Sequence, residues 1–210
     1  MQSRAGASQS RDGGGRSNER SGKHSSLASE SADAVLFGTL GQRAAVSRAT
    51  TVALLAETRR PALRVFDTNL RPPHYSDEVI ETSLYAANVL KSTGEELTVL
   101  ARLLCLDGGE DAQVHTLMRR YELRAVALTR GGQGSVLFTP RERVAHAATP
   151  AEVVDTVGAG DAFLAVFVLG LLRGDDLDVI GRHANRVAAY VCTQAGATPT
   201  LPDELRRQAT

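Results

Sequence analysis

The stretch Asp155-Thr156-Val157-Gly158-Ala159-Gly160-Asp161-Ala162-Phe163, near the C-terminus of a 210-residue chain, decides how this sequence folds. It follows the β-branched pair Val153-Val154 and continues into an apolar, helix-like segment, Ala162 to Leu172. We therefore expect the glycines to lie on a turn between a strand and a helix. Backbone N–H groups in such a turn point into open space at the helix N-terminus, which carries about half a positive charge and attracts anions such as phosphate.

A carboxylate lies directly after these glycines. Asp161 falls inside the first turn of the expected helix, beside the bound anion, where it can take a proton from a hydroxyl group. An anion-binding turn and a base together suggest transfer of a phosphoryl group from a nucleotide to an alcohol. The plainer interpretation, which a lone Gly-x-Gly would favour, is a tight turn with Asp161 stabilising the helix end.

The full nine-residue string resembles the C-terminal signature of the ribokinase/PfkB family of carbohydrate kinases, whose pattern is close to Asp-Thr-x-Gly-Ala-Gly-Asp-x-Phe. The resemblance implies that Gly158, Ala159 and Gly160 form the anion hole over the transferred phosphate. It also implies that Asp161 is the catalytic base. It extends from Ala34 to about Pro202, is best for the fructokinase-like branch, and matches only the C-terminal part of those enzymes.

The fold implied by the resemblance is α/β, a ribokinase-like layered structure with a mostly parallel central sheet flanked by helices. We expect the chain to lack the family's N-terminal strands, its Gly-Gly…Asn sugar-binding segment and its small β-sheet lid. Residues 1–32 are rich in Ser, Gly and Arg and poor in apolar residues, so they are expected to form a disordered head. Residues 33–206 are expected to form the C-terminal part of the kinase domain.

Apolar patterning supports an α/β fold independently, because strand-like and helix-like segments alternate from Ala34 onward. Such alternation predicts a layered, largely parallel sheet, and ligands bind such sheets beyond the carboxyl ends of the strands. The expected strands are 34–38, 63–67, 88–91, 125–129 and 135–138, and the expected helices are 44–59, 76–87, 95–104, 110–121 and one around 184–189.

Composition limits the classes of partner and location. The 24 Lys and Arg residues balance the 24 Asp and Glu residues, which argues against a nucleic-acid partner or a polybasic membrane surface. No apolar run reaches the length of a membrane span or forms the core of a secretory signal. Cys105 and Cys192 are expected to be buried thiols in a reducing compartment, so the predicted location is the cytoplasm.

A polar segment, Asp67-Thr68-Asn69-Leu70-Arg71, follows one of the expected strands. It resembles the family's Asp-Pro-Asn-x-Arg segment, with Thr68 in place of the proline. The guanidinium of Arg71 suits phosphate oxygens, while Asp67 and Asn69 would organise the loop or the bound substrate. The alternative is a simple turn with Arg71 in solvent.

The segment Lys91-Ser92-Thr93-Gly94-Glu95-Glu96-Leu97 resembles the family segment that ends in a glutamate just inside a helix. The resemblance places Glu96 near the Mg²⁺–phosphate shell, through water, and Thr93 at the nucleotide. The alternative is a capping box, in which Thr93 caps the helix and Glu96 reaches back to it. The two interpretations are compatible.

Three further segments carry resemblances. Thr129-Arg130-Gly131-Gly132-Gln133-Gly134 resembles the nucleotide-side loop, which implies nucleotide contacts from Thr129, Gly131 and Gly134, although a plain β-turn explains it equally well. In the helix that flanks the adenine in the family, Asn185 is the polar position. Gly196-Ala197-Thr198-Pro199 matches the closing stretch that, with Asp155 and Thr156, lines a monovalent-cation site in relatives.

Together these segments predict an ATP-dependent sugar kinase that uses Mg²⁺ and, at the second cation site, K⁺. The expected substrate is a small-molecule sugar, with fructose first, and the expected partners are a second copy of the chain or a complementing N-terminal half. The rival hypothesis is a non-catalytic, nucleotide-binding remnant, because the sugar-binding half is expected to be absent.

Overall fold

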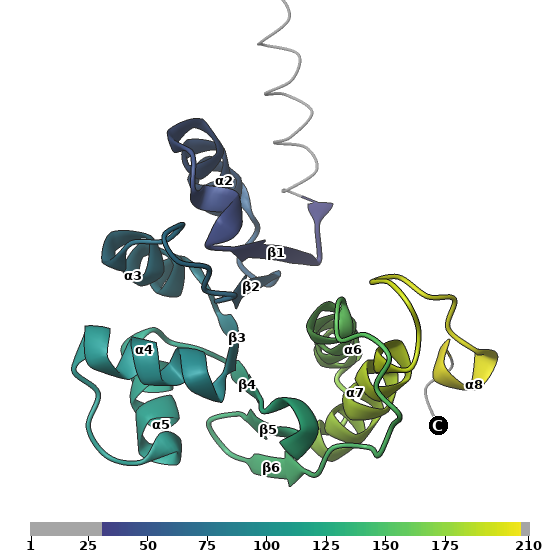
Figure 1. The fold of residues 1–210 in the computed structure, drawn as a ribbon. Coiled ribbons are helices and arrows are strands. Elements are labelled where there is room, and N and C mark those ends of the chain that lie inside the picture. The colour runs from purple at the N-terminus through teal and green to yellow at the C-terminus, as the bar shows by residue number, and fades with distance from the viewer. Residues whose placement is uncertain (1–30, 207–210) are drawn as a thin grey trace, which may run out of the picture.

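The computed structural model describes residues 31–206, so nearly all of the predicted disordered head lies outside the described residues (Figure 1). One six-stranded sheet has the order β1-β2-β3-β4-β5-β6. The first four strands run parallel, and β5 and β6 are antiparallel to their neighbours. The strands are β1 (Ala34–Gly38), β2 (Leu63–Asp67), β3 (Val89–Thr93), β4 (Ala125–Thr129), β5 (Ser135–Phe138) and β6 (Arg143–His146).

Helices cover both faces of this sheet, α3, α4 and α5 on one face and α6 and α7 on the other (Figure 1). The predicted α/β fold is confirmed, and so are the five strands and five helices predicted by their bounds, with shifts at the ends and a much longer α7; β6 was not predicted. The helices are η1 (Leu40–Gln42), α2 (Ala45–Glu57), α3 (Asp77–Ala86), α4 (Gly94–Leu104), α5 (Glu110–Arg120), η2 (Gly131–Gln133), α6 (Ala159–Arg173), α7 (Leu177–Cys192) and α8 (Asp203–Arg206).

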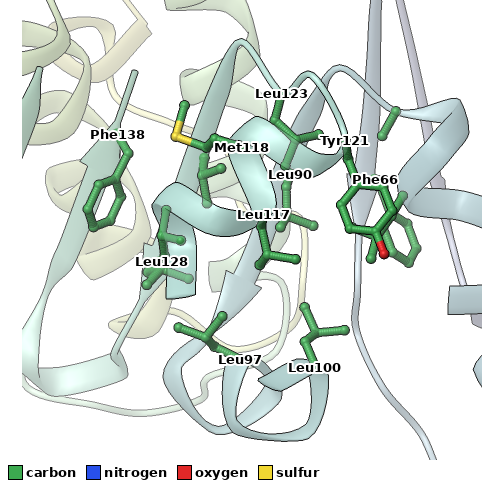
Figure 2. Packing of buried hydrophobic residues seen from close by; sticks show 14 of the residues in the cluster. Phe66, Leu90, Leu97, Leu100, Leu117, Met118, Tyr121, Leu123, Leu128 and Phe138 are labelled. Atoms are coloured by element: carbon green, nitrogen blue, oxygen red, sulfur yellow. The ribbon is translucent and has the colours of Figure 1, made fainter. Parts of the chain in front are cut away.

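Two hydrophobic cores form because successive residues of a strand point to opposite faces. Leu90 and Leu128 pack with Leu100 and Leu117 on the α4–α5 face, where all four are fully buried (Figure 2). On the α6–α7 face, strand residues such as Val65 and Val89 pack against those two helices. Burying each such side chain contributes roughly 1.5–3 kcal/mol, so the cores hold the carboxyl ends of the strands in fixed positions.

Two expectations were wrong. Val153 and Val154 form no strand: both are exposed, and the amide N–H of Val154 donates to the carbonyl oxygen of Cys192 (2.8 Å). In the described chain Val154 pairs with the last turn of α7 and neither valine pairs with a strand, so the glycines lie on a loop-to-helix turn. Cys105 is exposed rather than buried, because the chain leaves α4 there in a left-handed conformation (φ 53°).

The two ends of the sheet are covered unequally. Strand β1 lies at one edge, and Leu36 in its centre is 50% exposed. Exposed apolar side chains continue into η1 and α2, at Leu40, Val46 and Val52.

No helix within residues 31–206 is long and apolar enough to cross a membrane.

Candidate active site

A cavity of about 590 Å³ lies where the carboxyl ends of β3 and β4 meet the N-terminus of α6. Most of the predicted nucleotide and anion residues contribute to its wall, as expected for the carboxyl edge of a parallel sheet. The predicted residues in the wall are Thr93, Thr129, Gly131, Gly134, Thr156, Ala159, Gly160 and Asn185. Residues that were not predicted include Lys91, Phe163, Ala188, Ala189 and Cys192.

The turn into α6 has the geometry of an anion site. Gly158 adopts a left-handed conformation (φ +83°), and a Cβ there would lie 2.2 Å from the carbonyl oxygen of Ala197, so only glycine fits. Ala159 donates to Thr156 O at 3.3 Å, whereas the amides of Gly158 and Gly160 donate to no acceptor within residues 31–206. Unpaired amides at a helix N-terminus attract an anion.

The carboxylate of Asp161 is exposed in the first turn of α6. It forms no hydrogen bond or ion pair with any residue of the described chain, and it follows Gly160, which lines the cavity. A carboxylate without a partner, next to an anion-binding turn, is free to accept a proton from a substrate hydroxyl. The geometry therefore fits the predicted base, although Asp161 does not itself line the cavity.

A buried ion pair links two strands beneath this turn. Lys91 Nζ lies 3.0 Å from Asp67 Oδ1, and the two side chains are 8% and 13% exposed. Burial raises the pKa of Asp67, the ammonium of Lys91 opposes this rise, and the carboxylates of Glu96 and Asp161 add to it. The sequence contained one indication of Lys91, since a lysine directly after the apolar pair Val89-Leu90 of an expected buried strand is unusual.

Glu96 connects α4 to the loop after β2. Its Oε1 accepts the amide of Leu70 (2.8 Å), and its Oε2 accepts the hydroxyl of Thr68 (2.6 Å) and the amide of Thr93 (2.9 Å). The amide of Glu96 donates to Thr93 Oγ1 (3.1 Å), which completes the capping box. The capping interpretation is confirmed, and the contact of Glu96 with a magnesium shell stays a prediction.

The loop after β2 is held from a second side as well. The hydroxyl of Thr39 donates to Thr68 O (3.0 Å) and to Asn69 O (3.3 Å), and Asn69 is left-handed (φ 34°). Arg71 is exposed and forms no ion pair within the described residues. Neither Asn69 nor Arg71 lines the cavity, so their contacts with sugar or phosphate stay predictions.

The nucleotide side of the cavity combines a glycine-rich turn with an apolar wall. Gly131–Gln133 form η2, and Arg130 donates to Gly134 O (2.8 Å). The amide nitrogen of Asn185 donates to Ser135 Oγ (2.8 Å) and to Gly181 O (3.0 Å), so this side chain ties α7 to β5 while lining the cavity. Pockets with apolar walls and a few fixed polar groups are typical small-molecule sites.

The predicted monovalent-cation segments also come together. Asp155 Oδ1 accepts the amide of Val157 (3.0 Å), and Oδ2 accepts the amide of Gly196 (3.2 Å), from the closing stretch. These backbone bonds lower the pKa of Asp155. No group of three or more His, Cys, Asp or Glu side chains converges to hold a metal ion in the described part of the chain, so the cation itself stays a prediction.

The fold and the site together define a class of protein: an α/β structure with an anion-binding turn and an adjacent carboxylate at the carboxyl edge of a mostly parallel sheet. The profile of the pfkB family carbohydrate kinases matches residues 3–204. The chain belongs to this family, as the nine-residue signature indicated. Because the match begins at residue 3, the domain boundary at residue 33 stays a prediction.

Individual relatives agree with the family. The chain is 33% identical over 177 residues to a fructokinase from Salmonella thompson, covering 77% of this chain and 78% of that one. For a fructokinase from Salmonella typhimurium, also 33% identical, the coverage is 77% and 56%. The structure of an uncharacterized sugar kinase, PH1459 from Pyrococcus horikoshii, in complex with ATP matches with a TM-score of 0.65 at 27% identity, covering 80% and 54%. The chain thus spans about half the length of the latter two relatives.

Proposed function

We propose that this protein is the catalytic and nucleotide-binding part of an ATP-dependent sugar kinase. It would transfer a phosphoryl group from Mg²⁺–ATP to a sugar hydroxyl. One observation carries the proposal: the unpaired amides of Gly158 and Gly160 lie beside the carboxylate of Asp161, where α6 borders a cavity of about 590 Å³. An anion site, a base and a cavity of this size are the parts that phosphoryl transfer needs.

The nucleotide is proposed to lie along the cavity wall formed by Thr93, Thr129, Gly131, Gly134 and Asn185. The apolar surface of Phe163, Ala188 and Ala189 is suited to an adenine ring, and the turn of α6 to the terminal phosphate. The ATP complex of the P. horikoshii relative supports ATP as the nucleotide.

Asp161 is proposed to accept the proton of the sugar hydroxyl as that oxygen attacks the γ-phosphorus. The amides of Gly158, Ala159 and Gly160 would stabilise charge on the equatorial oxygens. Magnesium would neutralise charge on the nucleotide phosphates. Since the described residues contain no metal cage, the ion would be held mainly by phosphate oxygens and water, with Glu96 reaching it through water.

The sugar is proposed to be fructose or a related sugar, because two of the relatives are fructokinases. Asp67, Asn69 and Arg71 are the proposed contacts with sugar or phosphate, and Asp155 and Thr156 would line a K⁺ site. The protein is proposed to act in the cytoplasm, which fits its two free thiols.

Turnover is proposed to need the rest of the family fold, supplied by a complementing N-terminal half. The exposed apolar residues Leu36, Leu40 and Val46 at the β1 edge support such a partner or a second copy. The second candidate, a non-catalytic nucleotide-binding module, rests on the match to only about half of two relatives.

Calorimetry with Mg²⁺–ATP and a coupled ADP assay with fructose, ribose and other sugars test the proposal. The chain alone should bind Mg²⁺–ATP weakly and release almost no sugar-dependent ADP. Holding the hydroxyl in line with the γ-phosphorus contributes roughly 7–11 kcal/mol, and the sequence given spans only about half the length of two relatives. Co-expression with the N-terminal portion of a related fructokinase should restore turnover. Absence of nucleotide binding would contradict the proposal, and binding that never leads to turnover would favour the second candidate.

A further inference from the structure

Lys91 has an unusual place in the cavity. Of the residues that line it within 31–206, Lys91 alone carries a full charge. Val89 lies two residues earlier and packs toward α6 and α7, and side chains at alternate strand positions share a face, so Lys91 projects toward α6. Its Nζ lies 3.5 Å from the position that a Cβ on Gly160 would take. The ammonium is thus next to the unpaired amides of the anion-binding turn.

The composition of the chain makes this lysine more informative. Of the 24 Lys and Arg residues, only Lys23 and Lys91 are lysines, and Lys23 lies outside the described residues. Every cationic side chain in the described part except this one is therefore arginine. An ammonium is a compact point charge on a narrow stem, whereas a guanidinium is broad and planar. The side chain of Lys91 is 8% exposed, and a lysine stem needs less room in a buried position than a guanidinium does.

A purely structural ion pair is the simpler explanation, since Asp67 and Lys91 are paired residues on β2 and β3. Buried ion pairs contribute little net stability, however, because removing both charges from water is costly. An ammonium also has three donors. Asp67 is the only hydrogen-bond acceptor that Lys91 Nζ contacts among the described residues, which leaves donors for a ligand in the cavity.

The charges around Lys91 also favour a phosphate. The carboxylates of Glu96 and Asp161 act electrostatically on Asp67, and Lys91 is the cation that opposes them there. Asp67 holds the ammonium beside Gly160, so the pair places a positive charge where the turn offers its amides.

We propose that Lys91 binds the terminal phosphate of the nucleotide and that Asp67 is the positioning residue that holds its ammonium beside Gly160. The inference rests on the proposed function and adds the phosphate-binding cation to it. Lys91 forms no covalent bond and transfers no proton in this role. It stabilises charge on the terminal phosphate, so its effect depends on how many phosphates the nucleotide has.

The test compares affinities for Mg²⁺–ATP and for AMP, measured by calorimetry on the full chain. Lys91→Met should weaken ATP binding about 10- to 100-fold, the range for losing a hydrogen bond to a charged group, and change AMP binding less than about 3-fold. Asp67→Asn should lower the ATP-to-AMP affinity ratio by a smaller factor. Arg64→Met, which removes a partly buried cation from β2 away from the cavity, is the matched control and should leave the ratio unchanged.

A second measurement does not depend on how the variants fold. With lysine labelled at ¹³Cε, the unaltered chain should give two lysine signals, and Lys23→Arg assigns them. The Lys91 signal should move with Mg²⁺–ATP and hardly at all with AMP. The inference is overturned, and the proposed function left standing, by either of two results. One is that Lys91→Met weakens ATP binding and AMP binding equally. The other is that the Lys91 signal does not move when ATP binds. A chain that binds no nucleotide overturns both.

Discussion

The two ends of the sheet differ in how completely their side chains are buried. At the cavity end, formed by β3, β4 and β5 with α6 and α7, strand residues such as Leu90, Leu128 and Leu137 are fully buried. At the β1 end, formed by β1 and α2, no strand residue is fully buried, and α2 buries only Leu55. At the cavity end, helices cover both faces of the sheet. The β1 end exposes apolar side chains and an unpaired strand edge, which is typical of a surface that binds another protein.

The site lies at the border between these ends. The anion turn and the nucleotide wall belong to the cavity end, whereas Asp67 ends β2, the neighbour of β1. Thr39, just after β1, and Glu96, in α4, both hold the loop after β2. The proposed phosphate contacts are therefore built by well-packed elements, while the proposed sugar contacts adjoin the β1 end. This difference predicts which substitutions matter most.

The largest effect is expected in the core of the cavity end. Phe138→Ala should lower the free energy of unfolding by about 3–5 kcal/mol, the range for emptying the space of a buried aromatic ring, because Phe138 is fully buried. Leu36→Ala, at the β1 end, should cost about 1 kcal/mol or less, because half of this side chain is already in water. Urea unfolding of both variants measures the difference. Equal losses would mean that the two ends are equally packed in solution.

The next effect concerns catalysis. In a complemented, active enzyme, Asp161→Asn should lower kcat by at least ~10²-fold, the lower limit for losing a general base, with little change in ATP affinity. Asp77→Asn is the matched control, because Asp77 also lies exposed in the first turn of a helix, α3, away from the cavity. Steady-state kinetics compare the two. A loss shared by both variants would point to helix stability, and unchanged turnover in Asp161→Asn would refute the base.

Local sequence patterns predicted most of the cavity end. Its strands have five residues or fewer and contain consecutive apolar residues, and its signature is a continuous string. On the other face of the sheet, α3 and α4 begin at the caps Ser76 and Thr93. These are short-range features, so they are visible in sequence. Val153-Val154 misled the prediction because β-branched residues form a strand only where a neighbouring strand can pair with them.

Contacts between distant segments were harder to predict. Lys91 becomes a site residue only because the sheet places β3 beside the turn of α6, about seventy residues later in the chain. Likewise, the replacement of the family proline by Thr68 makes sense only once Glu96 is seen to accept its hydroxyl. Cys105 was expected in an apolar helix, but the left-handed residue that ends α4 turns it outward. Each of these depends on tertiary packing that a single sequence does not reveal.

A smaller effect separates backbone strain from close packing. Gly158 and Gly174 both have positive φ, +83° and +76°, but a Cβ on Gly158 would meet Ala197 O at 2.2 Å, whereas one on Gly174 would meet nothing within 4 Å. Gly174→Ala should cost about 1 kcal/mol for the left-handed backbone alone. Gly158→Ala should cost more and should also weaken ATP binding, since the turn must move. Unfolding curves and calorimetry test this. Equal losses of unfolding free energy in the two variants would mean that the segment containing Ala197 moves aside easily.

The smallest effect is a dependence of stability on pH at the cavity end. Burial lowers the pKa of His183 on α7 from its usual 6.5, and the nearby charges of Arg186 and Arg173 add to this. Below pH 6.5 the unfolded chain therefore binds more protons than the folded chain at this residue. Stability should rise as pH increases toward 6.5 and be independent of His183 above it.

His183→Gln removes this contribution. The difference in Tm between the unaltered chain and the variant should change as pH falls from 6.5 to about 5 and stay constant from 6.5 to 8, which serves as the internal control. The change should stay below the ~2–4 °C that 1 kcal/mol produces in a chain of this size, because one partly screened imidazole is involved. Calorimetric scans across the range measure it. A difference that is flat below pH 6.5 would mean that His183 reaches water freely, and that packing at the cavity end loosens where α7 meets the sheet.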